Sequence, residues 1–214
     1  MHSLQRFTVA VVHFFLRFSI GDRMIRFLAW QRRRVIRQRV EARLVAEGAY
    51  PNEVVAGPFA GMKLPGKNHY VDARFEKTFG AYEQELFPAL FRLAADPGRF
   101  RSLINIGAAD GFFAVGLARS FPAASVLAFE MQEAKQATLR EVARLNEVET
   151  RLELRGRCSI EDLNQLNPAL PALVVCDVDG FEEILLDPEK CPVLKGVDLL
   201  IETHDCYVDG ITST

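Results

Sequence analysis

The sequence predicts an α/β protein built on a doubly wound, mostly parallel β-sheet. From residue 99 onward, short apolar runs of strand length alternate with longer stretches of helical periodicity. Nearly every apolar run ends in a small or polar residue, which is typical of parallel strands that open towards a ligand. Apolar residues make up 49% of the chain and charged residues 25%, a balance that suits a globular protein with a substantial core.

The first 48 residues are predicted to form a basic helical extension. Residues 1–45 carry ten Arg against two acidic residues, a net charge of +8, so the rest of the chain sums to −10. From residue 23 to residue 47, apolar side chains recur at helical spacings with Arg mostly between them. Two interpretations stay open: this helix lies on an anionic membrane or partner, or it packs its apolar side chains on the body of the protein.

The sequence predicts a cytoplasmic protein. If the basic helix lies on a membrane, residues 1–45 would make peripheral contact with an anionic surface. Residues 7–20 are strongly apolar, but His13 and Arg17 interrupt them and the run is shorter than the ~20 residues that span a bilayer. A secretory signal and an organelle transit peptide are less favoured alternatives. The four Cys form no Cys-x-x-Cys pair, so we expect reduced thiols. The basic charge is confined to one arm, so no nucleic-acid partner is expected.

Residues 49–98 are predicted to connect this extension to the sheet. Gly and Pro are frequent in residues 50–70, which suits a connector with a short hairpin. Residues 73–95 are expected to be helical in two parts, broken near Gly80 or Pro88.

Residues 103–118 combine a buried strand, a glycine turn and a helix, and the rest of the sheet is expected to form around them. Gly107 and Gly111 allow a sharp turn and let the backbone approach a ligand closely. The free N–H groups of the following helix favour a carboxylate or a phosphate. A turn that needs glycine for packing alone is the competing explanation.

Four more strands are predicted, with helical sequence between them. The strands are expected at residues 125–129, 151–155, 172–176 and 197–201, and the helices at residues 133–146, 160–166 and 181–186. This alternation implies right-handed crossovers with helices on both faces of the sheet. We therefore divide the chain into the extension (1–48), the connector (49–98) and the sheet domain (99–214).

Polar residues cluster where the predicted strands end, so they should meet in one crevice. Glu130 lies 19 residues after Gly111, which matches an acid that accepts hydrogen bonds from both hydroxyls of a ribose. The Gly-x-x-x-Gly spacing departs from the Gly-x-Gly-x-x-Gly of dinucleotide sites and favours S-adenosylmethionine over NAD. The strand-end positions are Asn105, Glu130, Cys158 to Asp162, Asp177, Asp179, Glu202 and His204.

From about residue 80 onward, the chain resembles the FkbM-like branch of class I S-adenosylmethionine-dependent methyltransferases. Four motifs carry the resemblance in the family's order, together with an upstream Gly-x-Tyr-Glu. They are Gly80-Ala81-Tyr82-Glu83; Asn105 to Phe112, for Asp-x-Gly-Ala-Asn-x-Gly-Tyr; Phe129-Glu130; Asp177 to Glu182, for Asp-Val-Glu-Gly-x-Glu; and Glu202-Thr203-His204.

This resemblance implies a Rossmann-like methyltransferase sheet that binds S-adenosyl-L-methionine. It further implies O-methylation of a hydroxyl on a sugar, a polyketide or another small metabolite. In this assignment Gly107, Ala108 and Gly111 face the methionine part, Glu130 holds the ribose, and Cys158 to Asp162 lie near the adenine. The implied cofactor-binding residues are Tyr82, Glu83, Asn105, Gly107, Ala108, Asp110, Gly111, Glu130, Met131, Ser159, Ile160, Asp162 and Asp177.

Catalysis in such a site needs alignment of two reactants and a base for the acceptor hydroxyl. His204 is the preferred base because its ordinary pKa is near ~6.5. Asp177 and Asp179 are the alternatives. Asp179 and Glu182 could instead hold the turn or cap the next helix. A metal at Asp177, Asp179 and His204 is disfavoured, so no metal site is predicted.

The sequence departs from the family pattern at three places. Asn105 stands where the family has Asp, which removes a negative charge that Asp110 could replace, and Ala109 stands where the family has Asn. The sheet is expected to lack the last one or two strands of the class. These departures support the alternative of a catalytically defective, methyltransferase-like protein that binds a membrane or a partner. A nicotinamide oxidoreductase is the third choice.

Overall fold

The computed structural model describes residues 19–66 and 68–202, which fall into two compact units divided between Tyr50 and Pro51. The described part of the first unit is a single helix, α2 (Ser19–Ala46), so the helix predicted over residues 23–47 is confirmed. The apolar run at residues 7–20 lies almost wholly outside the described residues. Within those ranges, no helix combines the length and the apolar character that crossing a membrane requires.

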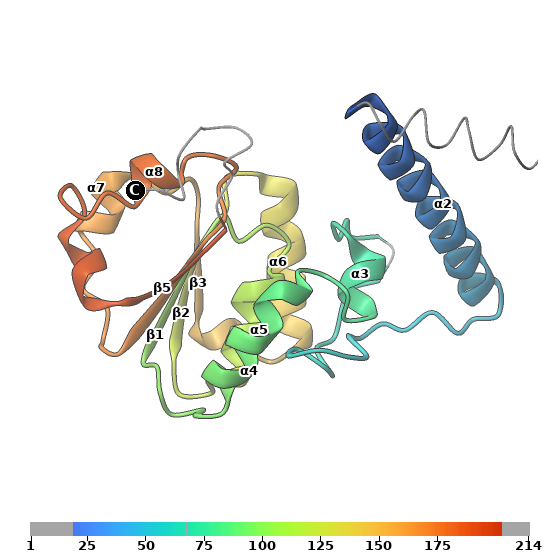
Figure 1. Ribbon diagram of the computed structural model, residues 1–214. Coiled ribbons are helices and arrows are strands. Elements are labelled where there is room, and N and C mark those ends of the chain that lie inside the picture. The colour runs from blue at the N-terminus through green and yellow to red at the C-terminus, as the bar shows by residue number, and fades with distance from the viewer. Residues whose placement is uncertain (1–18, 67, 203–214) are drawn as a thin grey trace, which may run out of the picture. The chain divides into compact units, whose positions relative to one another are not determined.

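The second unit contains the predicted doubly wound sheet, with five strands that all run parallel (Figure 1). Their order is β3-β2-β1-β4-β5, so the order reverses between β1 and β4. The strands are β1 (Ser102–Ile106), β2 (Ser125–Phe129), β3 (Leu152–Arg155), β4 (Ala172–Cys176) and β5 (Asp198–Ile201). Each strand lies within a residue or two of its predicted position, because a short apolar run between polar residues is a direct indication of a buried strand.

Helices cover both faces of this sheet (Figure 1). Side chains that alternate along β1 enter different cores: Leu103 packs towards α4, α5 and α6, and Ile104 packs towards α7 and α8. The covering helices are α4 (Phe87–Ala94), α5 (Phe112–Ser120), α6 (Glu133–Leu145), α7 (Ile160–Asn164) and α8 (Glu182–Leu185). Short 3-10 helices are η1 (Gln84–Leu86), η2 (Glu149–Arg151) and η3 (Pro192–Gly196).

The connector agrees with its prediction. The expected short hairpin is present as an antiparallel bridge between Glu53 and Lys63, flanked by backbone hydrogen bonds from the Val54 N–H to the Met62 carbonyl and from the Leu64 N–H to the Asn52 carbonyl. The helical region does break near Gly80, between α3 (Arg74–Thr78) and η1. Pro88 breaks nothing, because it lies in the first turn of α4, where its missing N–H has no helical partner to lose.

The strand ends are level across the switch point of the sheet. Ile106 is paired in register with Phe129 on β2 and with Cys176 on β4, so the three strands end together. Ligands of doubly wound sheets bind beyond this edge, where the strand order reverses. The fold therefore brings the loops after β1, β2 and β4 to one place.

Candidate active site

A cavity of about 840 Å³ opens beyond the carboxyl ends of the strands. A smaller cavity of about 40 Å³ adjoins it and shares Lys77, Tyr82, Gly107, Ala109, Asp177 and Glu202 as lining. The sequence-predicted residues that line the larger cavity are Tyr82, Gly107, Glu130, Met131, Ser159, Ile160, Asp177 and Asp179. Those that line only the smaller one are Glu83, Asn105, Ala108 and Asp110, whereas Gly111 and Asp162 line neither.

The glycine turn after β1 is pressed against the end of β4. Gly107 has a φ of +77°, and a Cβ at this position would overlap the backbone carbonyl oxygen of Asp177. Gly111, with a φ of +89°, lies against α6, and a Cβ there would lie 2.8 Å from the Cγ of Leu139. Gly111 therefore serves the packing of α5 on α6, and Gly107 serves the close approach of two strand ends.

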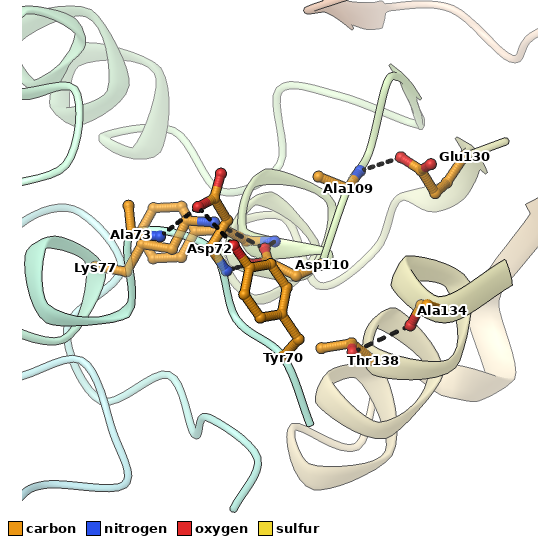
Figure 2. A network of polar contacts seen from close by, with 10 residues as sticks. Tyr70, Asp72, Ala73, Lys77, Ala109, Asp110, Glu130, Ala134 and Thr138 are labelled. Atoms are coloured by element: carbon orange, nitrogen blue, oxygen red, sulfur yellow. Dashed lines mark hydrogen bonds and ion pairs between the residues drawn. The ribbon is translucent and has the colours of Figure 1, made fainter. Parts of the chain in front are cut away.

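Glu130 joins the end of β2 to this glycine turn (Figure 2). Its carboxylate accepts the Ala109 N–H at 2.9 Å and the Gln132 N–H at 2.7 Å, and the side chain is 6% exposed. The predicted proximity of Glu130 to the glycine turn is thus confirmed. A carboxylate can accept about four hydrogen bonds, so acceptor capacity remains on the cavity side.

Asp110 does not replace the negative charge that Asn105 lacks, because its carboxylate is engaged by a buried cation (Figure 2). Lys77 Nζ lies 2.7 and 2.9 Å from the two carboxylate oxygens, with the side chains 3% and 4% exposed. The N–H groups of Asp72 and Phe112 donate to the same carboxylate at 3.0 and 3.3 Å. The ion pair between Lys77 and Asp110 links the connector to the glycine turn, a role that the sequence analysis did not predict.

Asn105 is buried at the end of β1 with an incomplete set of hydrogen bonds. Its amide nitrogen approaches the Val175 carbonyl at 3.5 Å, and its Oδ1 has no hydrogen-bond partner. Buried polar atoms are nearly always paired, so this oxygen is an acceptor that a ligand could satisfy. Asn105 lines the smaller cavity, beside the turn.

The smaller cavity is acidic. Glu83, Asp177 and Glu202 line it, and the charge of its one lysine is balanced by Asp110. Burial raises the pKa of Tyr82, and a hydrogen bond to Glu83 raises it further. Burial likewise raises the pKa of Glu83, with a further increase from Asp177. Three carboxylates in a confined space favour a ligand with positive charge.

The raised pKa of Glu83 predicts a pH-dependent cost of folding. Below its ordinary pKa of 4.5 the carboxyl is protonated in both states, and the cost grows as pH rises through the raised pKa of the folded state. The Glu83→Gln variant should therefore become more stable relative to the parent protein as pH increases, as measured by urea unfolding. Glu133→Gln, at an exposed position, is the matched control. A stability difference that is the same at every pH would contradict this expectation.

Asp162 caps its own helix and lines neither cavity. It accepts hydrogen bonds from the Ser159 N–H at 2.9 Å and from the Ser159 hydroxyl at 2.7 Å, and this lowers its pKa. The Ser159 Oγ in turn accepts the Asp162 N–H, which completes a capping box at the start of α7.

The lining of the cavity also includes Lys135, Arg157 and Phe181, which the sequence analysis did not single out. The Arg157 guanidinium lies 5.7 Å from the centre of the Phe181 ring, so the loops after β3 and β4 are in contact. Arg157 and Phe181 lie in loops after strands, and Lys135 lies in the first turn of α6, so only their positions along the chain could have indicated them.

The turn after β4 is held by Glu182. Its carboxylate accepts the Val178 N–H at 3.0 Å and is buried, so Glu182 supports the turn, as one of the two interpretations predicts. Asp179 and Gly180 both have positive φ, at 52° and 95°. Asp177 and Asp179 line the larger cavity. His204, the preferred base, lies outside the described residues.

Among the described residues, this edge of the sheet holds neither a cluster of metal ligands nor a reactive thiol. No group of three or more His, Cys, Asp or Glu side chains within residues 19–202, residue 67 aside, could hold a metal ion. Cys158, Cys176 and Cys191 are buried and unpaired, and burial raises the pKa of each thiol, to about 12 for Cys158. Such thiols are poor nucleophiles.

Several solved structures share part of the backbone course. No protein-family model matches the sequence, and no curated protein matches it. The O-methyltransferase TomG from Streptomyces achromogenes, involved in tomaymycin synthesis and solved with SAM, is 17% identical (TM-score 0.46, covering 62% of this chain and 59% of TomG). An O-methyltransferase from Bacillus cereus solved with SAH is 17% identical, with a TM-score of 0.45, and the match covers 71% of this chain and 64% of that enzyme. Cofactor-bound Rv0187 from MTB is 20% identical, with a TM-score of 0.47, and the match covers 67% of this chain and 76% of Rv0187. The chain thus spans less than two thirds of the Streptomyces and Bacillus enzymes.

Proposed function

We propose that this protein is an S-adenosylmethionine-dependent methyltransferase that acts on a hydroxyl group of a small acceptor. One observation carries the proposal: the buried carboxylate of Glu130 is hydrogen-bonded to the glycine turn at the edge of a large cavity. One group suits a ribose and the other suits the 5′ substituent of the same nucleoside, and they lie side by side.

The residues around the two cavities fit this cofactor. The remaining acceptor capacity of Glu130 suits the ribose hydroxyls, and the unpartnered Oδ1 of Asn105 suits an ammonium group. The acidic lining of the smaller cavity suits a ligand that carries both an ammonium and a sulfonium. Met131, Ser159 and Ile160 would contact the adenine. When bound, S-adenosylmethionine supplies a methyl group activated by the sulfonium.

This chain would then orient the acceptor and receive its proton. Alignment of two reactants is worth roughly 7–11 kcal/mol, which is the largest contribution expected of the protein. Asp177 and Asp179 line the cavity and are candidates to accept the proton of the acceptor hydroxyl. His204 remains the base preferred on sequence grounds. The acceptor class is inferred from the resemblance alone.

Isothermal titration with S-adenosylhomocysteine tests the proposal. We expect saturable binding to the full chain and a loss on the order of 100-fold in Glu130→Ala, because two charge-assisted hydrogen bonds at about 1.5 kcal/mol each would be removed. Glu133→Ala, at an exposed position on α6, should bind like the parent protein. No binding by a folded parent protein, or equal binding by both variants, would overturn the proposal.

The alternative is a methyltransferase-like protein that binds the cofactor weakly or does not methylate. It is supported by Asn105 at the end of β1 and by the ion pair between Lys77 and Asp110, which neutralises the nearest acidic side chain of the glycine turn. Cofactor binding without methyl transfer to any hydroxylated acceptor would support this alternative.

A further inference from the structure

Helix α2 exposes an apolar surface that the proposed reaction does not use. Nine of the seventeen exposed large apolar side chains among the described residues belong to this helix of 28 residues. Exposed apolar groups scattered singly are normal, but a concentration of this kind marks an interaction surface. The nine are Met24, Ile25, Phe27, Leu28, Trp30, Val35, Ile36, Val40 and Val45.

The same helix is strongly basic. Residues 24–46 contain seven Arg and a single acidic residue, Glu41. At about 100° per residue, Met24, Leu28 and Val35 share one face of the helix. Arg32, Arg39 and Arg43 border that face on one side, and Arg34 borders it on the other. Arginines at the edges of an apolar face can place their stems on apolar material and their guanidinium groups in an anionic layer.

Aromatic contacts occur elsewhere on the helix surface: at about 100° per residue, Phe27 lies about 80° and Trp30 about 140° from the centre of this face. The rings of Phe27 and Trp30 are 6.0 Å apart between centroids, and the Arg34 guanidinium lies 5.5 Å from the Trp30 ring. Trp30 is 52% exposed. Tryptophan beside arginine is typical of a boundary between water and an apolar phase, because each side chain has an apolar part and a polar end.

We propose that α2 binds the surface of an anionic lipid bilayer and lies in the interface plane. An anionic bilayer takes both the arginines and the apolar side chains of the helix. Nucleic acid would engage the arginines and leave the apolar groups in water. The density of Arg opposes insertion across a membrane. The inference stands apart from the proposed methyl transfer, and it would hold for an inactive protein.

Vesicle binding by the full chain tests the proposal. The full chain is mixed with vesicles of phosphatidylcholine alone, or with about a third of phosphatidylserine added, and vesicle flotation is recorded. We expect flotation with the anionic vesicles only. Flotation should weaken in 1 M salt, where the Debye length is ~3 Å.

Matched charge reversals separate α2 from the rest of the protein. The triple variant Arg32→Glu, Arg39→Glu, Arg43→Glu should lose affinity for anionic vesicles by on the order of 100-fold, at about tenfold or less for each Arg. The control is Arg92→Glu, Arg101→Glu, Arg140→Glu, which changes the net charge equally at exposed sites of the second unit. It should bind like the parent protein.

The apolar contribution is tested by Leu28→Gln with Val35→Gln, which should weaken flotation with the anionic vesicles and leave every Arg in place. The proposal is overturned by equal binding to neutral vesicles or by equal losses in the two charge-reversal variants. It is also overturned if the protein fails to float and instead shifts DNA, or if its mass in solution doubles with concentration, which would indicate a nucleic-acid partner or a second copy.

Discussion

Replacing Lys77 by methionine should lower the free energy of unfolding by about 3–5 kcal/mol. The variant leaves the Asp110 carboxylate 4% exposed without its counter-ion, and the remaining backbone donors cannot compensate a full buried charge. Urea denaturation followed by circular dichroism measures the loss. The glycine turn should also become less ordered, because Lys77 links it to residues 49–98. Binding of S-adenosylhomocysteine should therefore become weaker in the same variant that is less stable.

Two controls make this result specific. The double variant Lys77→Met, Asp110→Asn removes both charges and should recover part of the loss, because a buried pair is far more costly to break than to replace. Lys190→Met breaks an ion pair of the same length, 2.7 Å to Asp187, at an exposed site. It should cost at most about 1 kcal/mol. A loss in Lys77→Met no larger than in Lys190→Met would refute the structural role of the pair.

Gly107→Ala should cost about 3 kcal/mol or more, and it should abolish cofactor binding if the proposed function is right. A positive φ strains any L-residue by about 1–3 kcal/mol, and overpacking against a fixed backbone adds about as much again. The added Cβ would overlap the Asp177 carbonyl, so β1 and β4 could no longer end side by side. The measurements are urea unfolding and the titration described above.

Gly196→Ala is the matched control, because a Cβ there meets nothing within 4 Å and the residue lines neither cavity. It should leave both stability and binding nearly unchanged. If Gly107→Ala behaved the same way, the contact between the two strand ends would not be needed for the fold.

The strands of the sheet could be predicted because their cause is local. An apolar run of four or five residues between polar ones is buried wherever the chain goes, so β1 and β4 were found from the sequence within a residue or two of their ends. Glu130 was found for a similar reason, since its distance from the glycine turn in sequence is set by one helix and one strand.

The parallel sheet, the glycine turn and the Glu130 carboxylate beside it therefore follow from local patterns in the sequence. What the charges and glycines do there depends on how the elements pack in three dimensions. Asp110 meets Lys77, 33 residues away, and becomes a structural anion, while Gly111 makes room for Leu139. Periodicity predicts which side chains are buried, but a partner from another element of the chain is chosen by how the elements pack, and no local pattern records that choice.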